Sequence, residues 1–362
     1  MHFLPFLTKD FYPLTLTMDL ENVLFGAMSL GDRWRRIGKQ HIFDHQIWVE
    51  PTVMPDPTLV DAFYALLPGQ ALVQEDLLVA ICLRESDNIL DFAYPIQNWK
   101  LSYEIVEWSA PLDRITSLQY LIDHNADQIR RDGETGTPDH RDLTKNVIID
   151  EQQGPVIVDK KATILPGARI MGPVAILSGA VVKMGAEIYP GSTIGSYVVA
   201  NGEIKNAIIH EYSAKGHAGF LGDSIIGRWN NFGAGTTTSN VSNTFSNVRF
   251  EDWNTGEEVV TEVLKRGLVT GDFVKLGIMT KTYRATAIGP FSSIATSDAI
   301  QGNIPPMTWW TDSDKTRYNP DQLRTHCRRQ MALKGIVWDE IWESGLQNLL
   351  RDNNNPKNGF GK

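Results

Sequence analysis

A six-residue repeat runs through the middle of the chain and constrains its fold more than any other feature. From Val158 the sequence reads VDKKAT, ILPGAR, IMGPVA, ILSGAV, VKMGAE, IYPGST and IGSYVV. The first position of each hexad is always aliphatic: Val158, Ile164, Ile170, Ile176, Val182, Ile188 and Ile194. The fifth position holds only small or β-branched residues: Ala162, Ala168, Val174, Ala180, Ala186, Ser192 and Val198. An amphipathic helix repeats every 3.6 residues and a half-buried strand every two, so neither accounts for a period of six.

A strict period of six suits a coil of short parallel strands. One aliphatic side chain per strand would fill the interior, and the small residue would let the chain turn a corner. Tight corners are also favoured by recurring glycines and prolines: Gly167, Gly179, Gly185, Gly191, Pro166 and Pro190. We therefore predict a mainly β protein built around a left-handed parallel β-helix of hexapeptide repeats.

The repeat returns downstream and defines three predicted domains. It resumes at Ile226, Phe232 and Thr238, and again at residues 270, 276, 282, 288 and 294. The segment between, NVRFEDWNTGEEVVTEV, predicts two alternating strands around Asn254-Thr255-Gly256. We expect a small α/β domain over 1–150, a β-helix over 151–305 with a hairpin insertion near 241–267, and a C-terminal helical extension over 306–362.

One helix is expected before the repeat, and one or two are expected after it. One begins near Asp113, with Ile115, Leu118, Ile122 and Ile129 on its apolar face. Downstream, Asn319-Pro320 is typical of a helix start, because asparagine caps the helix and proline tolerates its first turn. A C-terminal apolar stripe is expected to pack on the coil or on a neighbouring subunit: Trp338, Ile341, Trp342, Leu346 and Leu349.

Composition narrows the function classes. A net charge of −9 argues against nucleic-acid binding, which needs clustered Lys and Arg. No segment is apolar enough to span a membrane and no leader is evident, so we expect a cytoplasmic protein.

Cys82 and Cys327 lack the spacing of a metal site, so both are expected to be buried thiols. No metal site is predicted; the spacing of His41, Asp44, His45 and Glu50 is not diagnostic, and we expect them on the surface.

The span from 199 to 240 carries a family resemblance. It contains Gly202-Glu203-Ile204-Lys205-Asn206, Gly216-His217, Leu221-Gly222-Asp223 and Asn231-Phe232-Gly233-Ala234-Gly235-Thr236, followed by Asn240. Together these pieces resemble the acetyltransferase domain of the bacterial bifunctional glucosamine-1-phosphate acetyltransferase and N-acetylglucosamine-1-phosphate uridylyltransferase (GlmU) family.

The resemblance implies a mechanism and a set of site residues. His217 would be the general base that deprotonates an amine of the sugar as it attacks the thioester of acetyl-CoA. Lys205 would contact the sugar phosphate, and Ala234 and Gly235 would lie at the thioester, where the Ala234 amide meets the developing oxyanion. The remaining acceptor contacts would come from Glu203, Phe220, Asn231 and Asn240. The acceptor would be an amino-sugar phosphate or a nucleotide sugar, bound with acetyl-CoA between the subunits of a homotrimer.

Two residues depart from the family pattern. Phe220 stands where the family has a tyrosine, and Val241 replaces an aromatic residue. Either the acceptor differs or activity is lost. Asn231 and Asn240 have a bland alternative as residues that stabilise turns. His210 is expected to be a solvated corner residue. Trp229 could line an acceptor site or pack between subunits, and of these we expect packing.

The N-terminal region carries a second resemblance. The run YPLTLTMDLENVLFGAMSLGDRWRRIG, residues 12–38, resembles the opening of nucleotidyltransferase-related proteins. No G-x-G-T-R-type loop follows, so we expect a binding or structural role here, and Mg²⁺ only if nucleotidyl transfer is retained. Sugar-1-phosphate nucleotidyl transfer and a non-catalytic trimeric scaffold therefore stand as alternatives to acyl transfer.

Overall fold

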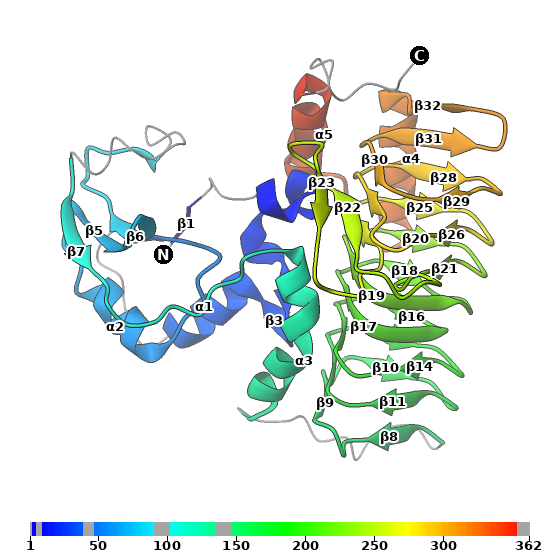
Figure 1. Ribbon diagram of the computed structural model, residues 1–362, viewed down its shortest axis with the longest axis horizontal. Coiled ribbons are helices and arrows are strands. Elements are labelled where there is room, and N and C mark those ends of the chain that lie inside the picture. The colour runs from blue at the N-terminus through cyan, green and yellow to red at the C-terminus, as the bar shows by residue number, and fades with distance from the viewer. Residues whose placement is uncertain (1, 5–8, 39–46, 90–101, 135–145, 353–362) are drawn as a thin grey trace. The chain divides into compact units, whose positions relative to one another are not determined.

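The computed structural model describes residues 2–4, 9–38, 47–89, 102–134 and 146–352 (Figure 1). The chain forms two compact units. The first comprises Met1–Asp10, Asp19–Val23 and Met28–Ser117, and the second Phe11–Met18, Leu24–Ala27 and Leu118–Lys362. Among the described residues, no helix is both long enough and apolar enough to cross a membrane.

The first unit is a small α/β structure. Its mixed sheet has the order β1 (His2–Phe3), β4 (Ile47–Val49), β6 (Leu77–Cys82), β5 (Gln70–Gln74) and β7 (Glu104–Glu107). It also holds the first two residues of the 3-10 turn Lys9–Phe11 and the whole 3-10 turn Leu20–Asn22. Strand β3 (Met28–Ser29) and helices α1 (Leu30–Gly38) and α2 (Pro57–Tyr64) complete it. Asp56 caps α2 by accepting hydrogen bonds from the Thr58 and Leu59 amides. The core forms where Trp34 of α1 stacks on Phe63 of α2, with 5.3 Å between ring centroids.

The second unit is a parallel β-helix, and the predicted fold class is confirmed. All seven aliphatic hexad positions are buried in one continuous core. Pairing recurs one turn later along the chain, so that Ile170 faces Ile188, eighteen residues on (188 − 170). Three strands therefore complete one turn, and identical positions stack in columns along the axis (Figure 1).

The strands of the coil lie on three faces. One face runs β10 (Thr163–Ile164), β13 (Val181–Val182), β16 (Val199–Ala200), β18 (Ala214–Lys215), β20 (Asn231–Phe232), β25 (Lys275–Leu276), β28 (Ser293–Ala295), β31 (Thr308–Thr311) and antiparallel β32 (Lys315–Arg317). A second column holds β21 (Thr237–Thr238), β26 (Lys281–Thr282) and β29 (Ala299–Ile300). The others share one sheet: β8 (Ile148–Asp150), β9 (Val156–Val158), β11 (Arg169–Met171), β12 (Val174–Ile176), β14 (Glu187–Ile188), β15 (Ser192–Ile194), β17 (Glu203–Ile209), β19 (Phe220–Ile226), β24 (Val269–Thr270), β27 (Ala287–Ile288) and β30 (Asn303–Ile304).

Strands β17 and β19 are long enough to continue across two faces. Asn206 and Asp223, in the middle of these strands, have φ of 48° and 47°. This left-handed conformation bends each strand where other turns use a separate corner, and asparagine and aspartate tolerate it better than most residues. The bend continues one hydrogen-bonded strand pair from Glu203 and Phe220 through Ile209 and Ile226.

An aromatic ladder follows another corner of the coil. Tyr197, Tyr212, Trp229, Phe273 and Phe291 all have φ between 58° and 62° and stack on one another, with successive ring centroids 4.9, 4.4, 5.9 and 5.3 Å apart. The ladder buries Trp229 inside its own chain, which confirms that this residue serves packing but not that it packs between subunits.

Two C-terminal helices cover the ladder. Helix α4 (Pro320–Ala332) begins as predicted, because the Asn319 side chain accepts hydrogen bonds from the amides of Asp321 and Gln322. Helix α5 (Glu340–Asp352) places the Trp342 ring edge-on to Phe273 at 5.0 Å. The predicted stripe is correct except for Ile341, which is 71% exposed. Cys327 in α4 and Cys82 in β6 are both buried thiols, as expected.

Helix α3 (Leu118–Glu134) begins later than expected and packs on the coil. The helix cannot start at Asp113 because the backbone there bonds elsewhere: Asp113 accepts from the Met54 amide and Ile115 donates to Thr52. Asn125 of α3 donates to the Gly191 carbonyl at 2.8 Å and accepts from the Gly26 amide at 2.7 Å. The helix therefore packs as part of the second unit. The three domain ranges expected from the sequence stay a prediction.

The N-terminal segment of the second unit is anchored by His210, which corrects the expectation of a solvated residue. His210 is fully buried; its Nε2 accepts from the Leu24 amide at 3.0 Å, and its Nδ1 lies 2.8 Å from the Ile226 carbonyl. Accepting at Nε2 requires a neutral ring with the proton on Nδ1. Burial lowers the pKa of His210 to about 4. Segment 24–27, with strand β2 (Leu24–Phe25), is thereby held on the coil. Leu16, in the turn Leu14–Leu16, packs on the cluster that contains Trp229 and Phe273.

The predicted hairpin is present. Strands β22 (Arg249–Glu251) and β23 (Glu258–Val260) pair antiparallel around the turn at Asn254-Thr255-Gly256. This pair is the excursion from the coil between Thr238 and Val269, and it forms one wall of the cleft described below.

The neutral state of His210 predicts an acid-sensitive stability. The folded pKa lies below the unfolded value of 6.5, so the unfolded chain takes up the proton first. The stability contributed by this group is complete above pH 6.5 and is lost as the pH falls toward 4, by about 1.4 kcal/mol per pH unit and about 3 kcal/mol in total. Urea unfolding of His210→Gln should show a shallower loss between pH 6.5 and 4.5 than the parent chain. His124→Gln, at an exposed position of α3, should keep the parental slope; the same slope in all three proteins would contradict the assignment.

Candidate functional site

His217 lies on an exposed corner of the β-helix between strands β18 and β19. The next corner along the axis carries Ala234 and Gly235, and the Gly235 amide donates to the Ala218 carbonyl at 3.1 Å. The two corners approach so closely that a Cβ on Gly219, where φ is 126°, would lie 2.1 Å from the Thr236 carbonyl oxygen. Glycine is therefore required at 219, and it places His217 beside the Gly-Ala-Gly turn.

Two lysines bind the backbone of the His217 corner. Lys215 Nζ donates to the His217 carbonyl at 2.5 Å and to the Asn201 carbonyl at 3.3 Å, and Lys183 Nζ donates to the Gly216 carbonyl at 2.9 Å. Lys215 is 2% exposed and pairs in register with Ala200, at an inward position that other turns fill with an apolar residue. Burial lowers the pKa of Lys215 to about 8. Sequence reasoning missed this residue, although a lysine at an inward position of the repeat was a visible signal.

The face that follows this corner brings together three predicted site residues. Glu203 pairs with Phe220, and Lys205 pairs with Gly222 across strands β17 and β19. A Cβ on Gly222 would lie 2.3 Å from the Phe220 ring, so glycine makes room for that ring to lean along the strand. Glu203 and Lys205 are exposed, and Lys205 Nζ lies 6.0 Å from the Tyr189 ring centroid. Lys205 and Glu203 thus lie on the same surface as the half-buried Phe220 ring.

Asn240 joins this face through a polar network centred on Asp223. The Asp223 carboxylate, which is 6% exposed, accepts from Asn240 Nδ2 at 2.5 Å and from Asn206 Nδ2 at 2.8 Å. The bland interpretation of Asn240 therefore describes part of what it does, because its amide nitrogen holds the bend of β19. Its role in sugar binding stays a prediction.

Asn231 lies apart from these residues. It is exposed on strand β20, where it pairs with Ala214 and Lys275 on the face that precedes the corner. The structure thus brings His217, Ala234 and Gly235 together on the corner ridge and Glu203, Lys205, Phe220 and Asn240 on the following face, with Asn231 on the preceding one.

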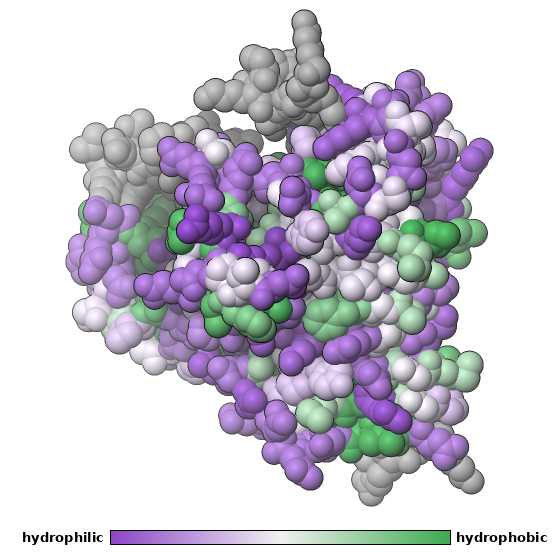
Figure 2. Space-filling model, turned by 45° about the vertical axis from the view of Figure 1, so that its right-hand side comes forward, coloured by the Kyte–Doolittle hydropathy of each residue, from purple (hydrophilic) through white to green (hydrophobic). Residues whose placement is uncertain are grey.

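The corner ridge also exposes apolar side chains. Met184, Ile278 and Met279 occupy corners of the same ridge and are 66%, 75% and 73% exposed. The Met279 amide donates to the Ala234 carbonyl at 2.7 Å, so the apolar pair directly adjoins the Gly-Ala-Gly turn. Figure 2 shows apolar patches interrupting a largely hydrophilic surface on this side of the molecule.

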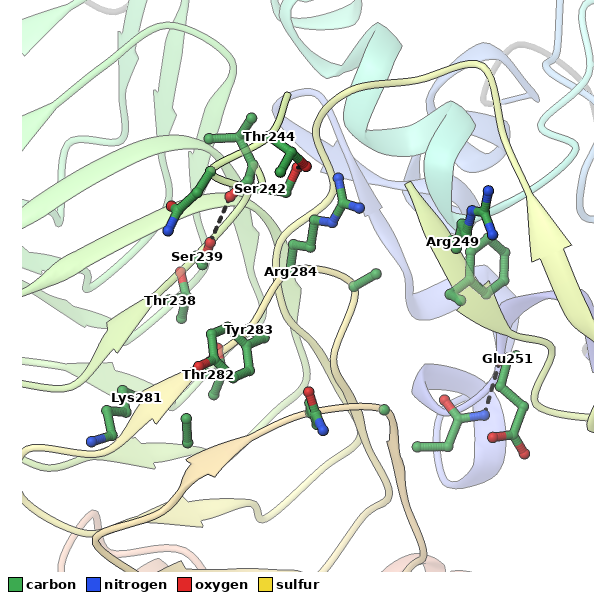
Figure 3. Close-up of a pocket in the computed structure, with 18 of the residues that line it drawn as sticks. Thr238, Ser239, Ser242, Thr244, Arg249, Glu251, Lys281, Thr282, Tyr283 and Arg284 are labelled. Carbon is green, nitrogen blue, oxygen red and sulfur yellow. Dashed lines mark hydrogen bonds between the residues drawn. The ribbon is translucent and has the colours of Figure 1, made fainter. Parts of the chain in front are cut away.

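A large cleft opens beside the site, between the coil and the hairpin β22–β23 (Figure 3). Its volume is about 1260 Å³, and none of the predicted site residues lines it. Arg284 lines the cleft and donates to the carbonyls of Ser246 and Asn247 at 2.5 and 3.1 Å. Asn303 holds the hairpin by donating to the Glu251 carbonyl at 2.9 Å. Sequence reasoning found the hairpin but not the cleft, because nothing in the pattern states how an excursion folds back on its coil.

The first unit holds a buried carboxylate. Glu50 is fully buried, so its expected surface placement is wrong; it accepts from Thr52 Oγ1 at 2.7 Å, and burial raises its pKa. His41, Asp44 and His45 lie outside the described residues. Within the described part of the chain, no group of three or more His, Cys, Asp and Glu is arranged to hold a metal ion.

Comparison with known proteins supports both resemblances. Residues 6–141 match a family model described as sugar nucleotidyl transferase. The chain is 36% identical over 168 residues to the bifunctional protein GlmU of Methanococcus aeolicus, covering 45% of this chain and 38% of that protein. It is 33% identical over 191 residues to GlmU of Pseudomonas putida, covering 48% and 38%. The predicted resemblance to GlmU is thus confirmed, and the chain aligns with less than two fifths of the length of these relatives.

The solved structures matched by the chain include proteins described as acyltransferases. A putative acetyltransferase of Bacillus cereus is 12% identical, with 57% of this chain and 99% of that chain covered and a TM-score of 0.30. The UDP-N-acetylglucosamine acyltransferase of Francisella novicida is 11% identical, with 58% and 87% covered and a TM-score of 0.31.

The buried charge of Lys215 predicts a gain in stability on its removal. Its folded pKa of about 8 lies below the ordinary value of 10.5, so its contribution to stability falls as the pH drops from 10.5 to 8 and stays low at pH 7. Lys215→Met should raise the free energy of unfolding at pH 7 by about 1–2 kcal/mol, the relief of desolvation less the lost carbonyl hydrogen bonds. Lys183→Met, at a half-buried position, should give no such gain in urea unfolding. A Lys215→Met protein that is less stable than Lys183→Met would contradict this.

Proposed function

We propose that the protein transfers an acyl group, acetyl in particular, from acyl-CoA to the amine of an amino-sugar phosphate or nucleotide sugar. The observation that carries the proposal is the pairing of two adjacent corners. Exposed His217 and exposed Ala234 are joined by the hydrogen bond between Gly235 and Ala218. An imidazole and a backbone amide turn thereby lie on one ridge, which supports a base and an oxyanion donor acting together.

The proposed chemistry needs both parts of the ridge. The sugar ammonium cannot attack a carbonyl until it loses a proton, and imidazole titrates in the range suited to accept one. As the amine nitrogen bonds to the thioester carbon, negative charge develops on the carbonyl oxygen, and the Ala234 amide is the donor we assign to it. The nitrogen of the adduct is still positively charged and loses its second proton to solvent. The C–S bond then breaks, and the proton held by His217 passes to the leaving thiolate.

The acceptor would lie on the face that follows the corner. Lys205 supplies a positive charge for a phosphate, and Glu203 beside it can accept from sugar hydroxyls. Phe220 offers a ring surface but no hydroxyl, so it can stack on a sugar and cannot hydrogen-bond to it. Asn231 and Asn240 stay candidate acceptor contacts, with Gly235 beside the thioester.

A homotrimer is the assembly that we propose. Met184, Ile278 and Met279 would be exposed to water in one copy, and burying them between copies would be favourable. Acetyl-CoA would then lie in the groove between neighbouring chains along the ridge. A cytoplasmic location stays a prediction.

A second candidate function belongs to the N-terminal region. The match of residues 6–141 to a sugar nucleotidyl transferase model favours sugar-1-phosphate nucleotidyl transfer, which would require Mg²⁺. The sequence lacks the glycine-rich loop that would hold a nucleoside triphosphate, which argues against this activity. We therefore expect no pyrophosphate release from a nucleoside triphosphate and a sugar 1-phosphate. Mg²⁺-dependent pyrophosphate release by the full chain would establish this second activity.

Replacing the proposed base tests the primary function. His217→Ala should lower kcat for acetyl transfer by about 10²–10⁴-fold while leaving the oligomeric state unchanged, because the side chain is exposed and makes no core contact. The matched control is His124→Ala, which removes an exposed imidazole from helix α3 and should keep parental activity. Thiol release measured with a series of amino-sugar phosphates and nucleotide sugars identifies the acceptor. Parental turnover in His217→Ala would contradict the role of His217 as the general base.

A further inference from the structure

We propose that the cleft between the coil and hairpin β22–β23 binds a nucleoside diphosphate moiety. The inference is drawn from the charged, hydroxyl and aromatic side chains that line the cleft. The link between the cleft and catalysis rests on the acyl transfer proposed above. Such a moiety could reach the site from two sources, the nucleotide of a sugar acceptor or the adenosine diphosphate portion of coenzyme A.

The size of the cleft exceeds what a small acceptor needs. A pocket for a drug-sized ligand is typically about 300–1,000 Å³, and this one is about 1260 Å³. A monosaccharide phosphate would leave most of it filled with water. The cleft therefore has room for a nucleoside diphosphate, from which a sugar or pantetheine arm can leave toward the ridge.

The charge of the lining favours an anion. The lining includes Arg249, Lys281 and Arg284 together with Glu251 and Glu258, so three cations and two anions leave a net +1 in a chain whose net charge is −9. The pair between Arg249 and Glu258 is loose, at 3.9 Å with both side chains more than 60% exposed. Exposed pairs of this kind contribute little, so Arg249 can turn to a phosphate. Lys281 is exposed on strand β26.

The remaining lining matches the other parts of a nucleoside diphosphate. Hydroxyl side chains lie on one side of the cleft, where Ser239, Ser242 and Thr244 are drawn in Figure 3, and these can bind ribose and phosphate oxygens. Tyr283, in the same wall, is 55% exposed and presents a ring on which a base can stack. Arg249 lies on the opposite, hairpin side, with Arg284 between (Figure 3).

The cleft adjoins the proposed reaction centre through strand β21. Thr237 lines the cleft, and its Oγ1 donates to the Gly235 carbonyl at 3.3 Å. A nucleotide held in the cleft is therefore one short strand away from the Gly-Ala-Gly turn. Its attached sugar or thioester arm can extend from there to His217.

Calorimetry on the full chain tests this with UDP, ADP and coenzyme A as separate probes. We expect at least one to bind, and we expect Lys281→Ala and Tyr283→Ala each to weaken the binding about tenfold or more. Lys161→Ala removes an exposed lysine from an early turn of the coil and should leave the affinity unchanged. Binding of UDP without coenzyme A assigns the cleft to a nucleotide-linked acceptor, and binding of coenzyme A and ADP without UDP assigns it to the donor. No binding of any probe, or binding that neither cleft variant weakens, would overturn the proposal.

The outcome separates the cleft from the proposed activity. His217→Ala should retain nucleotide binding with parental affinity, because His217 does not line the cleft. Nucleotide binding without acetyl transfer in the parent chain would leave the cleft established and remove the acyltransferase. Acetyl transfer without nucleotide binding would support the acyltransferase and overturn the assignment of the cleft.

Discussion

The close stacking of backbone on backbone around a narrow apolar interior is the constraint on which this structure depends. Each turn places a single aliphatic side chain per strand inside the coil, and each corner must pass within van der Waals distance of the corner below. Gly172, for example, leaves no room for a Cβ, which would lie 2.1 Å from the Gly154 carbonyl oxygen. The repeat of six is the sequence form of this requirement, and turns of other lengths return to the same register, since Ala200 pairs with Lys215 and Phe232 with Leu276.

Departures from this regularity gather around His217. Lys215 occupies an inward position, and Asn206 and Asp223 bend the neighbouring strands β17 and β19 through the left-handed region. A buried ammonium group opposes stability, and its retention is explained if the carbonyl of His217 must be held in place. Strain and buried charge of this kind are common where function and stability compete. The first unit shows no comparable concentration among its described residues, although Glu50 is a buried carboxylate there.

The outer layer of the second unit is held by specific polar contacts over apolar packing. Asn125 joins helix α3 to both the coil and segment 24–27, and His210 holds the same segment through the Leu24 amide. On another corner, the aromatic ladder gives helices α4 and α5 a flat surface, with Trp342 against Phe273. Arg228 adds a buried ion pair to Asp272 at 2.7 Å and lies over the Trp342 ring. Segments distant in sequence are thereby tied to one side of the β-helix, leaving the ridge that carries His217 exposed.

The sequence by itself determined the β-helix, the hairpin and the start of α4, because each follows from local rules: a period, a turn and a cap. It also pointed to His217 and its neighbours, since a family resemblance covers that span. Tertiary structure alone decided that His210 is buried, that helix α3 starts at Leu118, and that Lys215 supports the His217 backbone. It alone formed the cleft from Arg249, Lys281 and Tyr283. The reason is physical: a repeat specifies which side chains face inward, whereas burial of a corner and the walls of a cleft depend on distant segments folding back on the coil.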